Sequence, residues 1–167
     1  LEEFRNSFAE VIKCGVIRDV GLFELLEQKS RWFFDSLRRK IFANAQSAFL
    51  ETVIFRSARI KAEVVEEDEC ETRGKRMILN YGHTFAHALE GASGYRIPHG
   101  RAVAIGMIFA GELACRLGFF SPKAQERQVR LIARMGFPLR YGFSSARLLP
   151  FMKRDKKVRN GRLRFVL

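Results

Sequence analysis

Apolar residues recur at helical spacing along almost the whole chain. Phe8, Val11 and Ile12 begin the pattern, which returns at residues 22–26 and then across residues 42–64, a long segment without an internal glycine or proline. Spacing of three to four residues places apolar side chains on one face of a helix. The pattern therefore predicts an all-α, multi-helix body.

Capping residues predict the ends of two later helices. Ser121-Pro122 fits an N-cap followed by proline at the first helical position, and Gly136 follows the last periodic residue. Ser144 or Ser145 begins a shorter helix. The second half of the chain therefore also reads as helical.

The last residues follow a different pattern. Asn160-Gly161 lies between alternating residues from Lys157 to Phe165, which is a strong signal for a β-hairpin. There is no internal repeat, low-complexity tract or proline- and serine-rich linker. We therefore expect one helical domain over residues 1–167, with a short terminal β-hairpin.

The composition is that of an ordinary globular protein, with 47% hydrophobic and 29% charged residues among 167. Cys14, Cys70 and Cys115 lie far apart with no CxxC spacing, so they predict no disulfide framework and fit a reducing compartment. No stretch resembles a membrane span or a signal peptide. These features predict a cytoplasmic protein with no membrane partner.

The chain is strongly basic, with 30 Lys and Arg against 18 Asp and Glu and a formal net charge of +12. A positive balance fits nucleic acid, anionic lipid or an anionic small molecule. The basic residues are scattered and lack the aromatic alternation of a single-strand binding platform. We therefore expect no nucleic-acid partner.

The three histidines are clustered. His83 and His87 are four residues apart on a predicted helix, so their rings share a face and could reach one metal or one substrate. His99 follows Pro98, where the next helix is expected to begin. A single histidine on an apolar helix is usually a core residue, but three together with a carboxylate are typical of a catalytic metal site.

The first predicted helix offers that carboxylate. Glu10 and Lys13 are three residues apart on one face of an otherwise apolar segment. The alternative interpretation is a surface ion pair worth a few tenths of a kcal/mol. Spacing alone leaves both interpretations open.

Five segments in order resemble the helical C-terminal domain of the 3-dehydroquinate synthases. They include the core Asn-x-Gly-His-Thr-Phe-x-His of residues 80–87 and span nearly the whole chain. The segments are residues 9–13, 61–69, 76–90, 99–107 and 155–165.

The resemblance implies roles for nine residues. It implies that the metal, Zn²⁺ or Co²⁺, is held by Glu10, His83 and His99. It implies catalytic roles for His87, Lys13 and Asn80, and substrate binding by Lys61, Arg76 and Lys156, with Lys157 as a less certain alternative to Lys156. The sequence differs from the family pattern at Ala86, where glycine is usual, at Arg101, where glutamate is usual, and by one inserted residue near Thr72-Arg73. Because Arg101 reverses a charge two residues from His99, we expect altered surroundings for that histidine.

The resemblance also implies an activity. Family members use a metal and NAD to convert 3-deoxy-arabino-heptulosonate 7-phosphate into 3-dehydroquinate and phosphate, a lyase step of the shikimate pathway of aromatic amino acid biosynthesis. They are commonly homodimers and bind NAD mainly through an N-terminal α/β domain. No strand, glycine-rich turn and helix in this chain predicts such a domain, so NAD-binding residues are unknown and the chain alone is not expected to catalyse.

Three alternatives stay open. One is another sugar-phosphate cyclase, which makes an aminocyclitol precursor from a similar substrate. Another is a metal-dependent alcohol dehydrogenase-like domain, which needs no phosphate-binding cations and releases no phosphate. The last is a basic helical module that binds nucleic acid or a protein and is indifferent to loss of His83 or His99.

Overall fold

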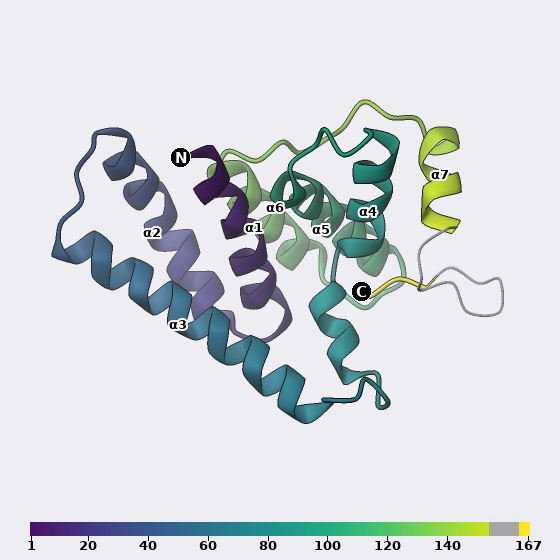
Figure 1. Ribbon diagram of the computed structural model, residues 1–167, viewed down its shortest axis with the longest axis horizontal. Coiled ribbons are helices and arrows are strands. Elements are labelled where there is room, and N and C mark those ends of the chain that lie inside the picture. Colours follow the sequence, from purple (N-terminus) through teal and green to yellow (C-terminus); the bar gives the residue numbers. More distant parts are fainter. Residues whose placement is uncertain (154–163) are drawn as a thin grey trace. The chain divides into compact units, whose positions relative to one another are not determined.

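The computed structural model describes residues 1–153 and 164–167, and these residues are mainly helical (Figure 1). Among them no residue forms a strand, so the prediction of an all-α body is confirmed. The helices in chain order are α1 (Glu2–Ile17), α2 (Val20–Arg38), α3 (Asn44–Glu67), the 3₁₀ helix η1 (Lys75–Asn80), α4 (His83–Ala92), α5 (His99–Arg116), α6 (Pro122–Arg134) and α7 (Ser145–Lys153).

The capping predictions are confirmed. The Ser121 hydroxyl accepts a hydrogen bond from the backbone N–H of Ala124 at 3.1 Å, with proline at the first helical position of α6. Gly136 follows that helix with φ +81°, a conformation that glycine adopts without strain. Of the two serines offered as the start of the next helix, Ser145 is the first residue of α7.

The predicted terminal β-hairpin is not supported. Residues 154–163, which include the Asn160-Gly161 turn, lie outside the described residues. Residues 164–167 are described and are not in a strand. The alternating pattern therefore has no counterpart in the part of the hairpin that the structure describes.

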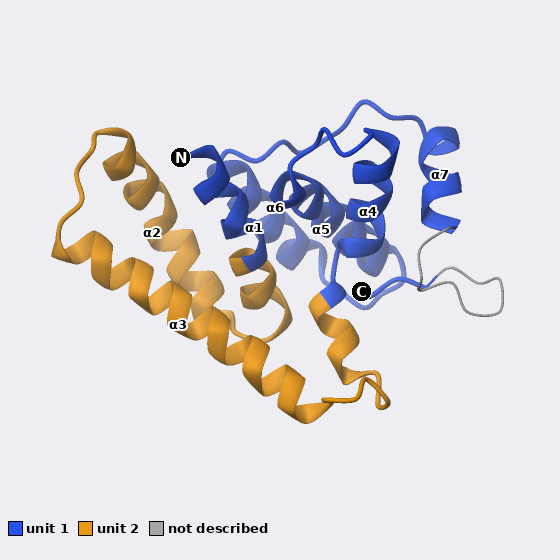
Figure 2. Ribbon diagram, viewed as in Figure 1, with its two compact units in different colours: residues 1–10, 80–167 blue, residues 11–79 orange. Residues whose placement is uncertain are grey.

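The chain divides into two compact units (Figure 2). Unit 1 contains residues 1–10 and 80–167, and unit 2 contains residues 11–79. Within the described helices, none combines the length and the apolar composition needed to cross a lipid bilayer.

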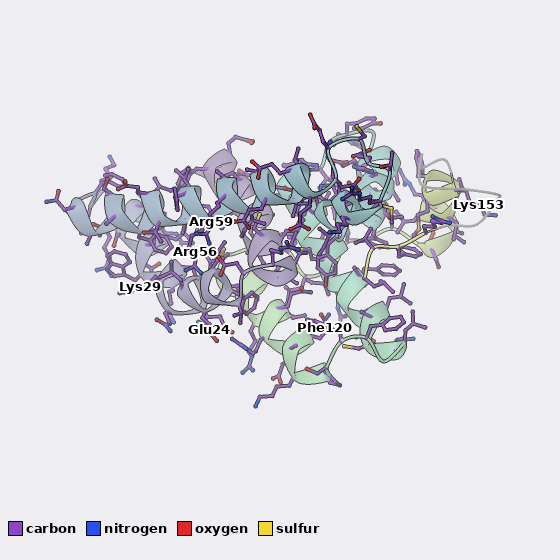
Figure 3. All side chains as sticks on the ribbon, turned by 90° about the horizontal axis from the view of Figure 1, so that it is seen from below. Glu24, Lys29, Arg56, Arg59, Phe120 and Lys153 are labelled. Carbon is purple, nitrogen blue, oxygen red and sulfur yellow. The ribbon has the colours of Figure 1, made fainter. Side chains whose placement is uncertain are left out.

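Unit 2 is built around the pairing of α2 with α3. The ring centroids of Phe33 on α2 and Phe49 on α3 are 4.8 Å apart, and both side chains are buried. Asp19 is the N-cap of α2 and accepts the Leu22 backbone N–H at 2.9 Å. The same carboxylate binds Arg56 on α3, with 2.8 Å between Nε and Oδ2; Figure 3 labels Arg56. One side chain thus both begins α2 and joins it to α3.

The core of unit 1 is centred on α5, which packs against α4 and α6. The rings of Phe85 on α4 and Phe109 on α5 stack at 4.2 Å and 15°. On the α6 side, the buried Gln128 amide donates to the Met107 carbonyl at 2.9 Å, and the Tyr81 hydroxyl lies 3.1 Å from the Gln128 Oε1. Aromatic packing and a buried polar network together position α5.

Two glycines allow α5 to approach its neighbours closely. A Cβ at Gly106 would lie 2.1 Å from the carbonyl oxygen of Gly82, immediately before α4. A Cβ at Gly100 would lie 2.1 Å from the carbonyl oxygen of Asn6 on α1. No side chain fits in either place, so the backbones of α4 and α1 contact α5 directly. Gly82 adjoins His83 and Gly100 adjoins His99, so both contacts lie beside predicted metal ligands.

Candidate metal centre

Three helices of unit 1 bring one carboxylate and two imidazoles together. Glu10 comes from α1, His83 is the first residue of α4, and His99 is the first residue of α5. One ligand atom from each lies within 4.8 Å of the other two. The Glu10 Oε1 is 3.5 Å from the His83 Nε2 and 3.7 Å from the His99 Nε2.

The local sequence explains why both histidines begin a helix. Gly82 has φ +77°, a left-handed conformation from which α4 starts at His83. Pro98 precedes His99 and has an extended backbone that ends the loop before α5. The helix start expected at His99 is confirmed, and the starts of α4 and α5 together present the two rings to Glu10.

A fixed acceptor faces the other nitrogen of each ring. The His83 Nδ1 lies 3.1 Å from the Tyr81 carbonyl oxygen, and the His99 Nδ1 lies 2.8 Å from the Glu90 Oε1. A carbonyl and an ionised carboxylate only accept hydrogen bonds, so each Nδ1 carries the proton. In the neutral ring this leaves the Nε2 lone pair directed at Glu10, which is the tautomer that a metal needs.

Electrostatics favour a positive charge at this position. The Glu10 carboxylate, followed by that of Glu90, raises the pKa of His99 to about 9, although partial burial opposes the shift. The side chains of Glu10, Glu90 and His83 are 25%, 13% and 12% exposed. Two partly buried carboxylates therefore create a negative site that attracts a cation.

The donor set fits a zinc-type ion. Two imidazole nitrogens and one carboxylate oxygen are the usual protein ligands of a catalytic zinc site, which keeps another position open for water or substrate. Ligand atoms about 2.0–2.1 Å from one tetrahedral ion are roughly 3.4 Å apart. The distances of 3.5 and 3.7 Å are close to that spacing.

His87 is not part of this group of donors. It is exposed on α4, and its ring centroid lies 5.6 Å from that of His83. Spacing along one helix favours His83 with His87, whereas the structure groups His83 with His99 from another helix. The side chain of His87 is therefore left beside the donors and open to solvent.

The remaining predicted residues lie in different parts of the chain. Asn80 ends η1 and is partly exposed. Lys13 is on α1, three residues after Glu10, and is only 2% exposed. Lys61 is exposed on α3, and Arg76 lies in η1, where its Nε is 3.2 Å from a Glu71 carboxylate oxygen. Lys13, Lys61 and Arg76 belong to unit 2, whereas Asn80 belongs to unit 1. Lys156 and its alternative Lys157 lie outside the described residues.

Sequence reasoning gave no role to the two acceptors that orient the histidines. Glu90 is seven residues after His83, two helical turns along the same face of α4, and that spacing was a usable signal. Tyr81 contributes through its backbone carbonyl, for which its residue type gives no signal. Burial raises the pKa of the Tyr81 phenol to about 12, consistent with its anchoring role in the core.

The structure shows what surrounds Arg101 and Ala86, the two residues that differ from the family pattern. The Arg101 Nη2 lies 2.6 Å from the Glu2 carboxylate on α1, so Arg101 pairs there while Glu90 orients His99. The expectation that Arg101 alters the surroundings of His99 therefore has no direct contact to support it. Ala86 is fully buried, and its backbone nitrogen is 3.2 Å from where a Cβ of Gly106 would lie.

Comparison with known proteins places these residues in a family. The family model described as 3-dehydroquinate synthase C-terminal matches residues 7–158. The 3-dehydroquinate synthases of Synechococcus sp. and Gloeobacter violaceus are 48% and 47% identical to this chain over 170 and 168 residues. The matches cover 100% and 99% of this chain and 44% of each relative, so the chain spans less than half of their length.

A solved structure shares the fold. It is ValA, a 2-epi-5-epi-valiolone synthase from Streptomyces hygroscopicus subsp. jinggangensis 5008 with NAD⁺ and Zn²⁺ bound. The TM-score is 0.80 at 23% identity, over 96% of this chain and 43% of that one. On the match of the family model to most of its length, the chain belongs to the 3-dehydroquinate synthase C-terminal family.

Proposed function

We propose that this chain is the metal- and substrate-binding part of a 3-dehydroquinate synthase. The complete protein would convert 3-deoxy-arabino-heptulosonate 7-phosphate into 3-dehydroquinate and phosphate. The observation that carries the proposal is the convergence of Glu10, His83 and His99 in a chain that matches this family.

Glu10, His83 and His99 would hold Zn²⁺ or Co²⁺. When bound, the ion polarises the oxygen at the reacting carbon of the substrate. Glu90 and the Tyr81 carbonyl keep the Nδ1 protons of the two rings in place. The chain thus supplies a preorganised donor set, which reduces the rearrangement needed when the ion and substrate bind.

His87 is proposed to contact the substrate and to hold or move a proton. Its ring is exposed beside His83, and an imidazole offers both a donor and an acceptor nitrogen. Asn80, at the end of η1, offers an amide that donates and accepts hydrogen bonds. Lys13 completes the proposed catalytic set.

Lys61, Arg76 and Lys156 are proposed to bind the carboxylate and phosphate of the substrate. Ammonium and guanidinium groups donate charge-assisted hydrogen bonds to these anions. The roles of these three residues, like that of Lys13, are assigned from the family motifs. Arg76 would exchange its present partner, Glu71, for the substrate.

The rest of the catalyst is proposed to lie outside this chain. The relatives are more than twice as long as the matched region, and we propose that an N-terminal α/β domain binds NAD. Residues 1–167 would then act as one helical domain of a cytoplasmic homodimer. The chain alone would be inactive.

Phosphate release by the complete protein tests the activity. Purified protein with NAD⁺ and Zn²⁺ is given the heptulosonate 7-phosphate or sedoheptulose 7-phosphate, and phosphate and carbocyclic product are measured. We expect turnover of the heptulosonate, and about 10²-fold or greater loss in His87→Ala, as for loss of a general acid or base. Oxidation of a simple alcohol without phosphate release would contradict the proposal.

The second candidate is a cyclase that acts on sedoheptulose 7-phosphate. It is favoured by the fold shared with ValA. The identity of 48% to a 3-dehydroquinate synthase, against 23% to ValA, makes it the weaker candidate. Turnover of sedoheptulose 7-phosphate alone would establish it in place of the first.

A further inference from the structure

We propose that Glu90 is a positioning residue that sets the tautomer of His99 and thereby the metal affinity of the site. The inference deepens the proposed function, because it requires Glu10, His83 and His99 to bind a metal. Glu90 itself is not proposed as a ligand.

The geometry of one contact carries this role. The Glu90 Oε1 lies 2.8 Å from the His99 Nδ1, whereas the Glu10 Oε1 lies 3.7 Å from the His99 Nε2. The imidazole is therefore held between two carboxylates, one on each ring nitrogen. Glu90 takes the nitrogen that points away from the other donors, which leaves Nε2 for a metal.

Burial shows which partner directs the other. The side chain of Glu90 is 13% exposed, whereas that of His99 is 50% exposed. The His99 ring also lies near that of His83, with 5.5 Å between the ring centroids, but it is the enclosed Glu90 carboxylate that lies at hydrogen-bond distance from the His99 Nδ1. Without Glu90, water would compete for the Nδ1 proton and the ring could turn.

One face of helix α4 carries both the ligand His83 and Glu90, the residue that orients His99. It begins with His83 and carries Glu90 two turns later. His83 is oriented by the neutral Tyr81 carbonyl, so the two ligands differ in the charge of their acceptor. With Glu10 and Glu90 both ionised, the site carries two negative charges to balance a divalent cation.

The expected effect is a loss of zinc affinity without loss of the fold. Removing a partner that orients a metal-bound histidine typically lowers metal affinity 10–100-fold. We expect that loss for Glu90→Ala. A smaller loss is expected for Glu90→Gln, whose neutral amide oxygen still accepts the hydrogen bond from the His99 Nδ1–H.

The test measures the pH-independent Zn²⁺ affinity of the full chain, obtained by competition with a chromophoric chelator at several pH values, because Glu90 also raises the pKa of His99 and the His99 proton competes with the metal. The matched control is Glu112→Gln, an exposed carboxylate on α5 that pairs with Arg116 at 3.1 Å and is expected to change affinity less than twofold. Circular dichroism and thermal unfolding of the metal-free variants report the fold separately. An affinity for Glu90→Ala within twofold of the unchanged chain would overturn the proposal.

A second measurement needs no variant. ¹⁵N-histidine NMR of the zinc-loaded chain should show His99 with a protonated Nδ1 and a metal-bound Nε2. The reverse tautomer would overturn the role of Glu90 while leaving the metal site intact. If the unchanged chain binds no zinc, both this inference and the proposed metal site are wrong.

Discussion

At the scale of single residues, the centre depends on which nitrogen of each histidine faces Glu10. In both rings Nδ1 has a protein acceptor and Nε2 is directed at the Glu10 carboxylate. His99 differs because two carboxylates contact it, and they raise its pKa to about 9. In the metal-free chain at neutral pH, this imidazole is therefore protonated.

This protonation predicts that zinc binding depends on pH. A metal binds only the neutral ring, so at pH 7 it must displace the His99 proton. From pH 6 towards pH 9 the affinity should rise about tenfold per pH unit from this group alone, and the His99 contribution should level off above pH 9. Calorimetry in buffers of different ionisation enthalpy should detect a proton released near pH 7. Binding without proton release would contradict the stated pKa.

Exchanging the charges of Glu2 and Arg101 tests whether that pair acts independently of the metal. The pair is 2.6 Å apart and exposed, with 60% and 44% of the side chains accessible. Arg101→Glu should lower the free energy of unfolding by at most about 1 kcal/mol through repulsion with Glu2, and Glu2→Lys should restore it in the double variant. Zinc affinity should stay within about twofold throughout. A larger change in zinc affinity would show that Arg101 does alter the surroundings of His99.

At the scale of helices, backbone contacts determine where the ligands meet. Gly100 lets α5 lie directly on the Asn6 carbonyl, one turn before Glu10 on α1. Gly106 does the same with Gly82, which precedes His83 on α4. The two contacts seat the helices that carry all three donors.

Gly100→Ala should therefore disturb both stability and metal binding. A Cβ 2.1 Å from a carbonyl oxygen forces α5 away from α1 and should cost about 1–3 kcal/mol, although alanine is the better helix former. The control is Gly142→Ala, where a Cβ meets no atom within 4 Å. Unfolding in urea and zinc titration of both variants measure the two effects. Equal unfolding free energies and zinc affinities of the two variants would contradict the close contact between Gly100 and the Asn6 carbonyl.

The pH dependence of stability tests the ion pair between Asp19, at the start of α2, and Arg56 on α3. Burial by itself raises the pKa of this carboxyl, but the hydrogen bonds from Arg56 and the Leu22 backbone N–H, with the charges of Arg56 and Arg59, together hold the pKa below its usual value. Its stabilisation is therefore present above the unfolded pKa of about 3.9 and is lost as the pH falls through the lower folded value. Asp19→Asn keeps the capping oxygen and should lower the free energy of unfolding by about 1–2 kcal/mol at pH 7, with the difference shrinking as the pH falls below about 3.9.

The comparison variant is Asp35→Asn, whose exposed carboxylate pairs at 3.8 Å with Arg31 and Arg38 on its own helix. It should change stability by less than about 0.5 kcal/mol. A difference between Asp19→Asn and the unchanged chain that does not depend on pH would contradict the ion pair with Arg56.

Local signals predicted the helices, because apolar spacing and caps such as Ser121 act within a few residues. Contacts between side chains that are distant in the sequence could not be predicted from such local signals. The pairing of Glu90 with His99 and of Arg101 with Glu2 follows from how the helices pack. The set of Glu10, His83 and His99 came from family resemblance, since spacing alone favours His83 with His87.

At the scale of the whole molecule, the basic charge is unevenly divided. Unit 1 has 17 basic and 7 acidic residues, whereas unit 2 has 13 and 11. The metal donors lie in the more basic unit, where the positive charge would favour the anionic substrate proposed above. The proposed function and the role of Glu90 both require that Glu10, His83 and His99 bind one divalent ion.

Elemental analysis of the purified chain after zinc loading and desalting tests that claim most directly. We expect about one zinc per unchanged chain and per His87→Ala chain, and little zinc in Glu10→Ala, His83→Ala and His99→Ala, because two remaining ligands hold zinc weakly. Stoichiometric zinc in all three ligand variants, or loss of zinc in His87→Ala alone, would contradict the account.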